Sequence, residues 1–252
     1  MSIFLELYRV LFMGQIRLYI PQRLAVNQQV VLDEQQSHYL ANVMKLKTGQ
    51  VLKGFDNQSG EYDCEIVELN KKHTVLNVIS QGKPYQQVPD IWLLFAPIKK
   101  DNTDFVIQKA TELGVRRIVP VLTRYTITER IKKERFEANA IEAAEQSRRT
   151  DIPEIAEAVK FEALMQNWDK KRTLYYMDET LNGEPVSKVF AKAPAPCAIL
   201  VGPEGGFSEE ELKFLRACPF AKGVSLGKRI LRAETAVVAA ISCWQAMSGD
   251  WQ

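Results

Sequence analysis

The chain has 252 residues, of which 46% are hydrophobic and 25% are charged, a balance that supports one large or two modest folded domains and excludes a disordered chain. The formal net charge of +2 excludes a polycation that coats nucleic acid indiscriminately, so any RNA contact must come from local basic patches. The four cysteines form no closely spaced pair, and we expect no metal site.

Residues 1–14 form an apolar segment whose only charged side chains are Glu6 and Arg9. The segment is too short for a bilayer-spanning helix, which needs about 20 residues, and it has neither the basic start nor the cleavage site of a signal peptide. We expect a cytoplasmic protein with no membrane anchor. Residues 1–14 are then an N-terminal extension of unclear role, either an upstream addition or an amphipathic contact helix.

Residues 15–83 predict a small β-rich domain. β-Prone runs at 61–69 and 74–80 are separated by a turn-forming cluster at 70–73, which is a hairpin pattern, and one short helix is expected over 34–46. This pattern is typical of a small β-barrel. A polar, Pro-containing joint at 81–89 follows, and we expect a second domain over 88–252.

Beyond the joint, short apolar strands alternate with helices. Strands are expected at 91–96, 117–122, 173–177, 197–201 and 223–226, and helices at 101–113, 132–149, from 208 onward and at 232–248. Ser208 and Glu211 have the spacing of a capping box, Gly114 suits a helix C-terminal cap, and Phe105 and Val106 are expected on one helix face. The alternation predicts an α/β domain with a mainly parallel sheet covered on both faces.

Three strand ends in this domain carry unusual loops, and ligands bind at the carboxyl ends of strands in such sheets. The first loop follows Met177, the second is the glycine-rich segment 200–208, and the third is the charged segment 226–235. The second loop matches neither common phosphate-binding pattern, which favours a nucleoside-like ligand without a bound triphosphate. A tight turn without a ligand would explain the second loop about equally well, and a charged helix start would explain the third.

The loops, taken in order, resemble one family closely. Leu200-Val-Gly-Pro-Glu-Gly-Gly-Phe-Ser208 and Leu226-Gly-Lys-Arg-Ile-Leu-Arg-Ala-Glu-Thr-Ala236 look like the two motifs that bind S-adenosyl-L-methionine (AdoMet) in the bacterial ribosomal RNA small subunit methyltransferase E family. Ile107-Gln-Lys-Ala-Thr-Glu-Leu-Gly114, Glu142-Ala-Ala-Glu-Gln-Ser-Arg148 and Arg17-Leu-Tyr-Ile-Pro21 match further family segments. The resemblance extends from about Ile16 to the C-terminus.

The resemblance implies a SPOUT-type, trefoil-knotted α/β methyltransferase domain preceded by a PUA-like β-barrel. It implies AdoMet as cofactor, a homodimer that buries the active site at its interface, and methyl transfer to N3 of a uridine in 16S rRNA. The substrate is then small-subunit rRNA or the assembled small ribosomal subunit. A last helix that is apolar nearly all round, at 235–247, also favours burial against a second copy.

The motifs assign roles to individual residues. Arg232 is expected to stabilise negative charge on the uracil or to anchor a phosphate, and Glu234 to orient Arg232 or only to cap the helix, while no residue is a clear general base. The cofactor-binding residues are expected to be Met177, Leu200, Val201, Gly202, Pro203, Glu204, Gly205, Gly206, Leu226, Gly227, Ile230 and Leu231. The RNA-binding residues are expected to be Arg17, Arg23, Lys45, Gln146, Arg148 and Arg149.

The chain departs from the family pattern at positions that concern RNA more than the cofactor. Arg124-Tyr125-Thr126 stands where a Glu-Arg-Ser triplet is common, and Lys45 stands where the family often has arginine. Two alternative functions remain open from the sequence. One is the same chemistry on another rRNA or tRNA position, and the other is a catalytically silent RNA-binding factor in ribosome assembly.

Overall fold

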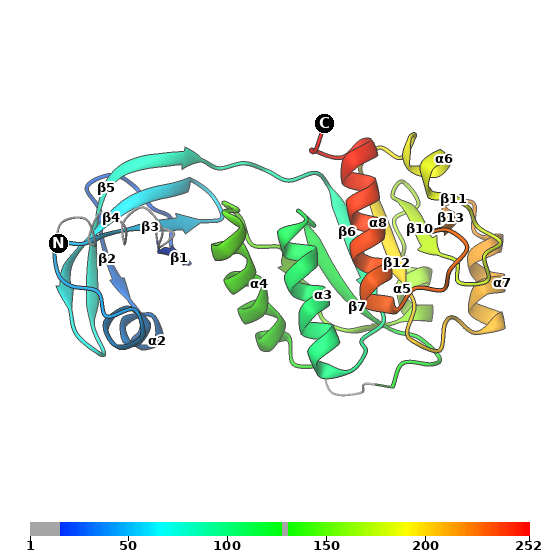
Figure 1. Cartoon of the computed structure of the whole chain (residues 1–252), viewed down its shortest axis with the longest axis horizontal. Helices are drawn as coiled ribbons and strands as arrows, with labels where there is room; N and C mark the ends of the chain where they lie inside the picture. The colour runs from blue at the N-terminus through cyan, green and yellow to red at the C-terminus, as the bar shows by residue number, and fades with distance from the viewer. Residues whose placement is uncertain (1–15, 128–130) are drawn as a thin grey trace, which may run out of the picture. The chain divides into compact units, whose positions relative to one another are not determined.

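The computed structural model describes residues 16–127 and 131–252, and the extension expected at residues 1–14 lies outside the described part. The chain forms two compact units (Figure 1). The first contains the residues up to Gln87 together with Ala144–Asp151, and the second contains Val88–Ala143 and Ile152–Gln252. The grouping of Ala144–Asp151 with the first unit departs from the continuous segment 88–252 that the sequence predicted, because contacts between distant residues leave no local sequence signal.

The first unit is built on a five-stranded sheet. Its strands are β1 (Arg17–Tyr19), β2 (Gln29–Leu32), β3 (Val51–Asp56), β4 (Gly60–Leu69) and β5 (Thr74–Pro84). They lie in the order β1-β3-β4-β5-β2, with β1 parallel to β3 and the other pairs antiparallel. Alternate side chains such as Leu52, Ile66 and Leu76 are fully buried in one core, which confirms the predicted β-rich domain.

The hairpin between β4 and β5 turns where the sequence predicted it. The Asn70 side chain accepts hydrogen bonds from the backbone N–H groups of Lys72 (3.0 Å) and His73 (2.8 Å), which is why asparagine favours such turns. The predicted helix over 34–46 is instead split into α2 (Glu34–His38) and the π-helical turn η1 (Tyr39–Val43).

The second unit is built on a parallel sheet. Its strands are β6 (Ile91–Phe95), β7 (Arg117–Leu122), β8 (Glu154–Ile155), β9 (Val159–Lys160), β10 (Thr173–Met177), β11 (Glu184–Pro185), β12 (Cys197–Val201) and β13 (Ala221–Ser225). They lie in the order β11-β13-β10-β12-β6-β7-β8, with β9 also beside β7, and every described pair is parallel. The prediction of a mainly parallel sheet is therefore confirmed.

Helices cover both faces of this sheet. They are α3 (Lys100–Glu112), α4 (Lys133–Ser147), α5 (Phe161–Gln166), α6 (Val186–Phe190), α7 (Glu209–Ala217) and α8 (Ala233–Ser248). Neighbouring side chains along a strand point to opposite faces. Ile199 and Val201 therefore pack in the core beneath α3, α6 and α8, whereas Leu200 packs beneath α5 and α7. Figure 1 shows α3 and α8 side by side, and they are in direct contact.

The sequence predicted the ends of the helices more accurately than it predicted which helix faces are buried. Ser208 and Glu211 form the predicted capping box, and Gly114 follows α3 with a φ of 80°. The predicted placement of Phe105 beside Val106 on the buried face is wrong, because Val106 is buried whereas Phe105 is 40% exposed and lies under Lys109. No helix of the described residues is long and apolar enough to cross a membrane.

Candidate functional site

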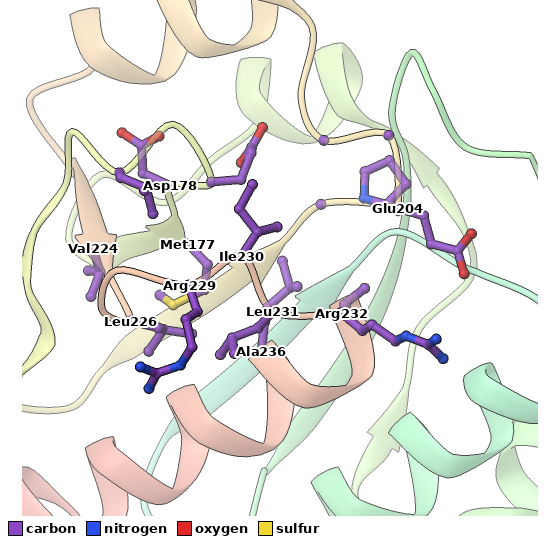
Figure 2. A pocket seen from close by; sticks show the side chains of 18 of the residues that line it. Met177, Asp178, Glu204, Val224, Leu226, Arg229, Ile230, Leu231, Arg232 and Ala236 are labelled. Atoms are coloured by element: carbon purple, nitrogen blue, oxygen red, sulfur yellow. The ribbon is translucent and has the colours of Figure 1, made fainter.

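A cavity of about 690 Å³ lies at the carboxyl edge of the parallel sheet. The loops that follow β10, β12 and β13 line it together with the starts of α3 and α8 (Figure 2). Its volume is within the range of about 300–1,000 Å³ that is typical of small-molecule sites. The residues of the predicted site that line it are Met177, Val201, Gly202, Pro203, Glu204, Gly205, Gly206, Leu226, Gly227, Ile230, Leu231 and Arg232.

Leu200 is the one predicted cofactor residue that does not line the cavity. Its side chain is fully buried in the core beneath α5 and α7, on the opposite face from Val201. The prediction took the loop motif as a continuous run and included a residue whose side chain the strand directs away from the site.

Five polar residues that line the cavity are not among the predicted site residues, and one of them is Arg229 of the third loop. Lys99 and Asn102 come from the start of α3, just after β6, and Asp178 and Glu179 come from the loop after β10. The signal was present for Asp178 and Glu179, because their loop was one of the three unusual strand ends. The start of α3 lies at the same sheet edge, but it has no glycine that would have drawn attention to it.

The glycine-rich loop is held in shape by a carboxylate from the neighbouring loop. Oε1 of Glu179 accepts a hydrogen bond from the backbone N–H of Phe207 at 2.8 Å. Gly206 has a φ of 71°, and a Cβ atom at that position would lie 2.5 Å from the same oxygen. The backbone conformation therefore favours glycine at position 206, and any other side chain would also displace the Glu179 carboxylate.

The third loop presents cations and an apolar side chain that have no partner among the described residues. Gly227 has a φ of 111°, and Ile230 is 78% exposed. Within the described part of the chain, no hydrogen bond or ion pair engages the guanidinium group of Arg229 or Arg232, and both line the cavity. In Figure 2 these two side chains project to different sides of the loop. The site thus keeps positive charge available for a ligand or substrate.

Glu234 lies in the first turn of α8 and does not line the cavity. One of its carboxylate oxygens is buried without a hydrogen-bond partner among the described residues, and no ion pair joins Glu234 to Arg232 there. The structure therefore offers no contact through which Glu234 would orient Arg232. Its negative charge in the first turn of α8 is favourable to the helix dipole.

Three carboxylates line the cavity, and two of them are engaged. Asp178 accepts hydrogen bonds from the backbone N–H (3.0 Å) and hydroxyl (2.6 Å) of Thr180, and Glu179 accepts one from Phe207. Glu204 is exposed, and no hydrogen bond or ion pair engages its side chain within the described residues. Within the described residues, Glu204 is therefore the cavity carboxylate with both oxygens free, and it can accept a proton.

The prediction that Arg17 binds RNA is corrected by its position in the first unit. Its side chain is 6% exposed, pairs with Glu61 at 2.6 Å and stacks over Phe55. The guanidinium also donates to the backbone carbonyls of Ala144 and Glu145 (both 2.8 Å) and Arg149 (2.7 Å). Arg17 therefore ties Ala144–Asp151 to the strands of the first unit, and its buried guanidinium is engaged inside the protein and not presented to RNA.

Arg149 also belongs to the protein interior. Its side chain is 7% exposed and forms a two-point pair with the Asp151 carboxylate, with N···O distances of 3.0 and 2.8 Å. The prediction that Arg149 reaches RNA is therefore corrected, because the guanidinium fork is already matched to a carboxylate. The other predicted RNA-binding residues are all exposed in the first unit: Arg23, Lys45, Gln146 and Arg148.

The chemistry of the cavity fits a nucleoside-like cofactor. Met177, Val224 and Ala236 provide apolar surface, while the glycines of the second loop bring backbone N–H and C=O groups to its edge. Apolar walls with a few convergent polar groups are what a planar base and a ribose require. The described residues contain no cluster of three or more His, Cys, Asp or Glu side chains that could hold a metal ion.

Comparisons with known proteins agree with this chemistry. Residues 85–245 match a model of an RNA methyltransferase domain, and residues 32–79 match a model of an RNA methyltransferase PUA domain. The ribosomal RNA small subunit methyltransferase E of Rickettsia conorii is 33% identical over 90% of this chain and 93% of its own length. The protein of the same name from Buchnera aphidicola of Schizaphis graminum is 34% identical over 93% of this chain and 97% of its own length.

Solved structures with the same fold carry the cofactor. A ribosomal RNA small subunit methyltransferase E from Neisseria gonorrhoeae, bound to S-adenosyl methionine, matches with a TM-score of 0.86 at 28% identity and covers 95% of this chain and 100% of that one. A Legionella pneumophila protein in complex with the same cofactor matches with a TM-score of 0.85 at 28% identity, over 94% and 99% of the two chains.

Proposed function

The chain belongs to the ribosomal RNA small subunit methyltransferase E family, and from this premise we propose that it transfers the methyl group of AdoMet to N3 of a specific uridine in bacterial 16S rRNA. The protein is an AdoMet-dependent rRNA methyltransferase with a SPOUT-type α/β domain and a PUA-like domain. One observation carries the assignment of the site: the three unusual strand ends converge on a single cavity.

The cofactor is held mainly by backbone and apolar groups in this proposal. Glycines 202, 205 and 206 let the second loop approach the ribose and base, and Leu226 to Leu231 surround the adenosine from the other side. The Ile230 side chain is 78% exposed, and an adenine ring that covers it would bury this apolar surface. When bound, AdoMet supplies an electrophilic methyl group on a sulfonium, which is a good leaving group. The trefoil knot that the resemblance implies would form around these loops.

The protein must activate the uridine, because N3 carries a proton and is a poor nucleophile until that proton leaves. Arg232 is exposed at the cavity and free of internal partners, so it can stabilise negative charge on the uracil oxygens or anchor the adjacent phosphate. Glu204 can accept the N3 proton, a role worth about 10²–10⁴-fold in rate. Turnover by a folded Glu204→Gln protein that matches the wild type would remove Glu204 from this role.

We further propose a cytoplasmic homodimer that acts on small-subunit rRNA or on the assembled subunit. Helix α8 keeps Val238, Ala239 and Ala246 at least partly exposed, although its opposite side is buried against the sheet. Small apolar side chains of this kind permit close packing against a second copy. Light scattering at micromolar protein should give twice the mass of one chain, and a monomer mass would contradict the dimer.

The experiment that tests the reaction is transfer of tritium from labelled AdoMet, followed by nucleoside analysis. We expect N3-methyluridine in 16S rRNA, whether the RNA is supplied naked or in subunits. A different methylated nucleoside would support the alternative of another rRNA or tRNA position. AdoMet-independent RNA binding with no methyl transfer to either substrate would instead support a catalytically silent assembly factor.

A further inference from the structure

The short turn after β7 lies at the same edge of the sheet as the cavity. Its described residues run from Thr123 to Ile127, and two large side chains in it face solvent: Tyr125 is 49% exposed and Ile127 is 82% exposed. Single exposed apolar residues are common on protein surfaces and need no explanation by themselves. Tyr125 differs because of what its other side contacts.

Tyr125 packs against the glycine-rich loop that lines the cavity. A Cβ atom built on Gly205 would lie 3.3 Å from Cβ of Tyr125 and 3.7 Å from the first ring carbon. The tyrosine therefore lies directly against a cavity-lining residue, and a side chain at position 205 would press on Tyr125. Within the described residues, the Tyr125 ring takes part in no aromatic pair, cation–π contact or hydrogen bond.

The backbone that carries Tyr125 is fixed from both sides. The N–H of Arg124 donates to Oε1 of Glu211 at 2.9 Å, and Glu211 is a buried residue of the α7 capping box. The N–H of Thr123 donates to Oγ1 of Thr126 at 2.9 Å, which closes the turn. A ring on a fixed backbone loses little conformational entropy when it binds a partner.

We propose that Tyr125 is a stacking platform for an unpaired base of the RNA substrate, next to the base that receives the methyl group. Sequence-specific RNA recognition relies on splayed, unpaired bases that stack on aromatic side chains. Cations for the flanking phosphates are nearby, since Arg124 is exposed beside Tyr125, and Lys99 and Arg232 line the cavity. The proposal rests on the proposed function, because it requires RNA as the substrate.

The test compares substitutions at Tyr125 by their affinity for unmodified 16S rRNA transcribed in vitro. Removal of a stacked aromatic costs about 1–3 kcal/mol per base, so Tyr125→Ala should weaken RNA affinity roughly 5- to 150-fold. Tyr125→Phe keeps the flat face and should stay within about threefold of the wild type, whereas Tyr125→Leu keeps apolar area without a flat face and should resemble Tyr125→Ala. The AdoMet affinity should be unchanged in all three.

Phe105→Ala is the matched control, because it removes a comparably exposed aromatic ring that lies under Lys109, whereas Tyr125 packs against the cavity-lining Gly205. It should leave RNA affinity unchanged. An RNA affinity of Tyr125→Ala equal to that of the wild type would overturn the platform. A change from dimer to monomer mass in that variant would also overturn it, because this would place Tyr125 in a subunit interface. Failure of the proposed function is distinct: the wild type would then bind RNA and transfer no methyl group. A wild type that binds neither this RNA nor the assembled small subunit overturns both.

Discussion

Arg172 at the amino edge of the parallel sheet and Arg232 at its carboxyl edge differ in the contacts that they make within the protein. At the amino edge, Arg172 precedes β10 and donates to the Asp90 carboxylate at 3.1 and 2.8 Å and to the carbonyl of Cys197 at 3.1 Å. Its guanidinium also lies 3.8 Å from the centre of the Trp92 ring. At the carboxyl edge, Arg232 lines the cavity, and within the described residues it makes no such contact.

The difference separates arginines that stabilise the fold from arginines that are available for a ligand. A buried guanidinium must be matched by carboxylates, carbonyls or an aromatic face, because an unmatched buried charge is very costly. A guanidinium left unmatched at a cavity keeps its binding capacity for a substrate. By the same criterion, Arg17 and Arg149 belong with Arg172, although the sequence patterns had grouped them with RNA-binding residues.

The largest effect is expected from removing the unmatched cation. Arg232→Ala should lower methyl transfer to 16S rRNA roughly 100- to 1,000-fold, equivalent to about 2.7–4 kcal/mol, because it removes charge stabilisation where the uracil becomes negative. AdoMet affinity and the free energy of unfolding should be unchanged. Lys213→Ala, which removes an exposed cation outside the cavity, is the control and should turn over normally. Near-normal turnover of Arg232→Ala would remove that role and leave the family assignment standing.

The opposite pattern is expected at the amino edge. Arg172→Ala should lower the free energy of unfolding by about 3 kcal/mol, because it removes the two-point partner of the Asp90 carboxylate and the stack on Trp92. Chemical denaturation measures the loss, with Lys171→Ala as the exposed neighbour that should cost almost nothing. The folded variant should still bind AdoMet normally. A clear loss of AdoMet affinity without a loss of stability would break the distinction between the two edges.

The dependence of stability on pH sharpens the same contrast. Burial raises the pKa of Asp90, but the hydrogen bond and charge of Arg172 and the charge of Arg116 outweigh it, so the pKa lies below its ordinary value of 3.8. A depressed carboxyl pKa stabilises the folded state above the unfolded pKa, and this stabilisation is lost as the pH falls through the folded pKa.

The expected measurement is the difference in unfolding free energy between the wild type and Asp90→Asn. It should be about 1.5–3 kcal/mol and constant between pH 7 and about 5, and it should shrink as the pH falls below 3.8. A difference that grows on acidification would show that Asp90 does not act through its ionised form.

The sequence predicted those features that depend on local patterns. The bounds of β7, β10 and β12, the capping box of α7 and the meeting of three loops at one edge follow from strand periodicity and from glycine positions. The short helices α5 and α6 were not predicted, because five or six residues do not establish a helical period. Phe105 was wrongly predicted to lie on the buried face of α3, because the sequence does not show where on the helix surface the buried face ends.

Side-chain roles were predicted less well, because they depend on partners far away in the sequence. Nothing near Arg17 shows that its guanidinium meets carbonyls about 130 residues later. The same holds for Glu204, whose availability emerges only when Asp178 and Glu179 are seen to be engaged. Charge alone identifies candidates, and the contacts decide which of them are free.

The central claim is that the cavity at the carboxyl edge binds AdoMet, and calorimetric titration of matched variants tests it directly. Ala236 lines the cavity from helix α8, whereas Ala138 is exposed on helix α4 and does not line the cavity. We predict that the wild type binds AdoMet, that Ala236→Leu weakens binding at least about tenfold, or ~1.4 kcal/mol, by filling the cavity, and that Ala138→Leu binds as the wild type does. A folded Ala236→Leu protein with wild-type AdoMet affinity, or a wild type that does not bind AdoMet, would contradict the account.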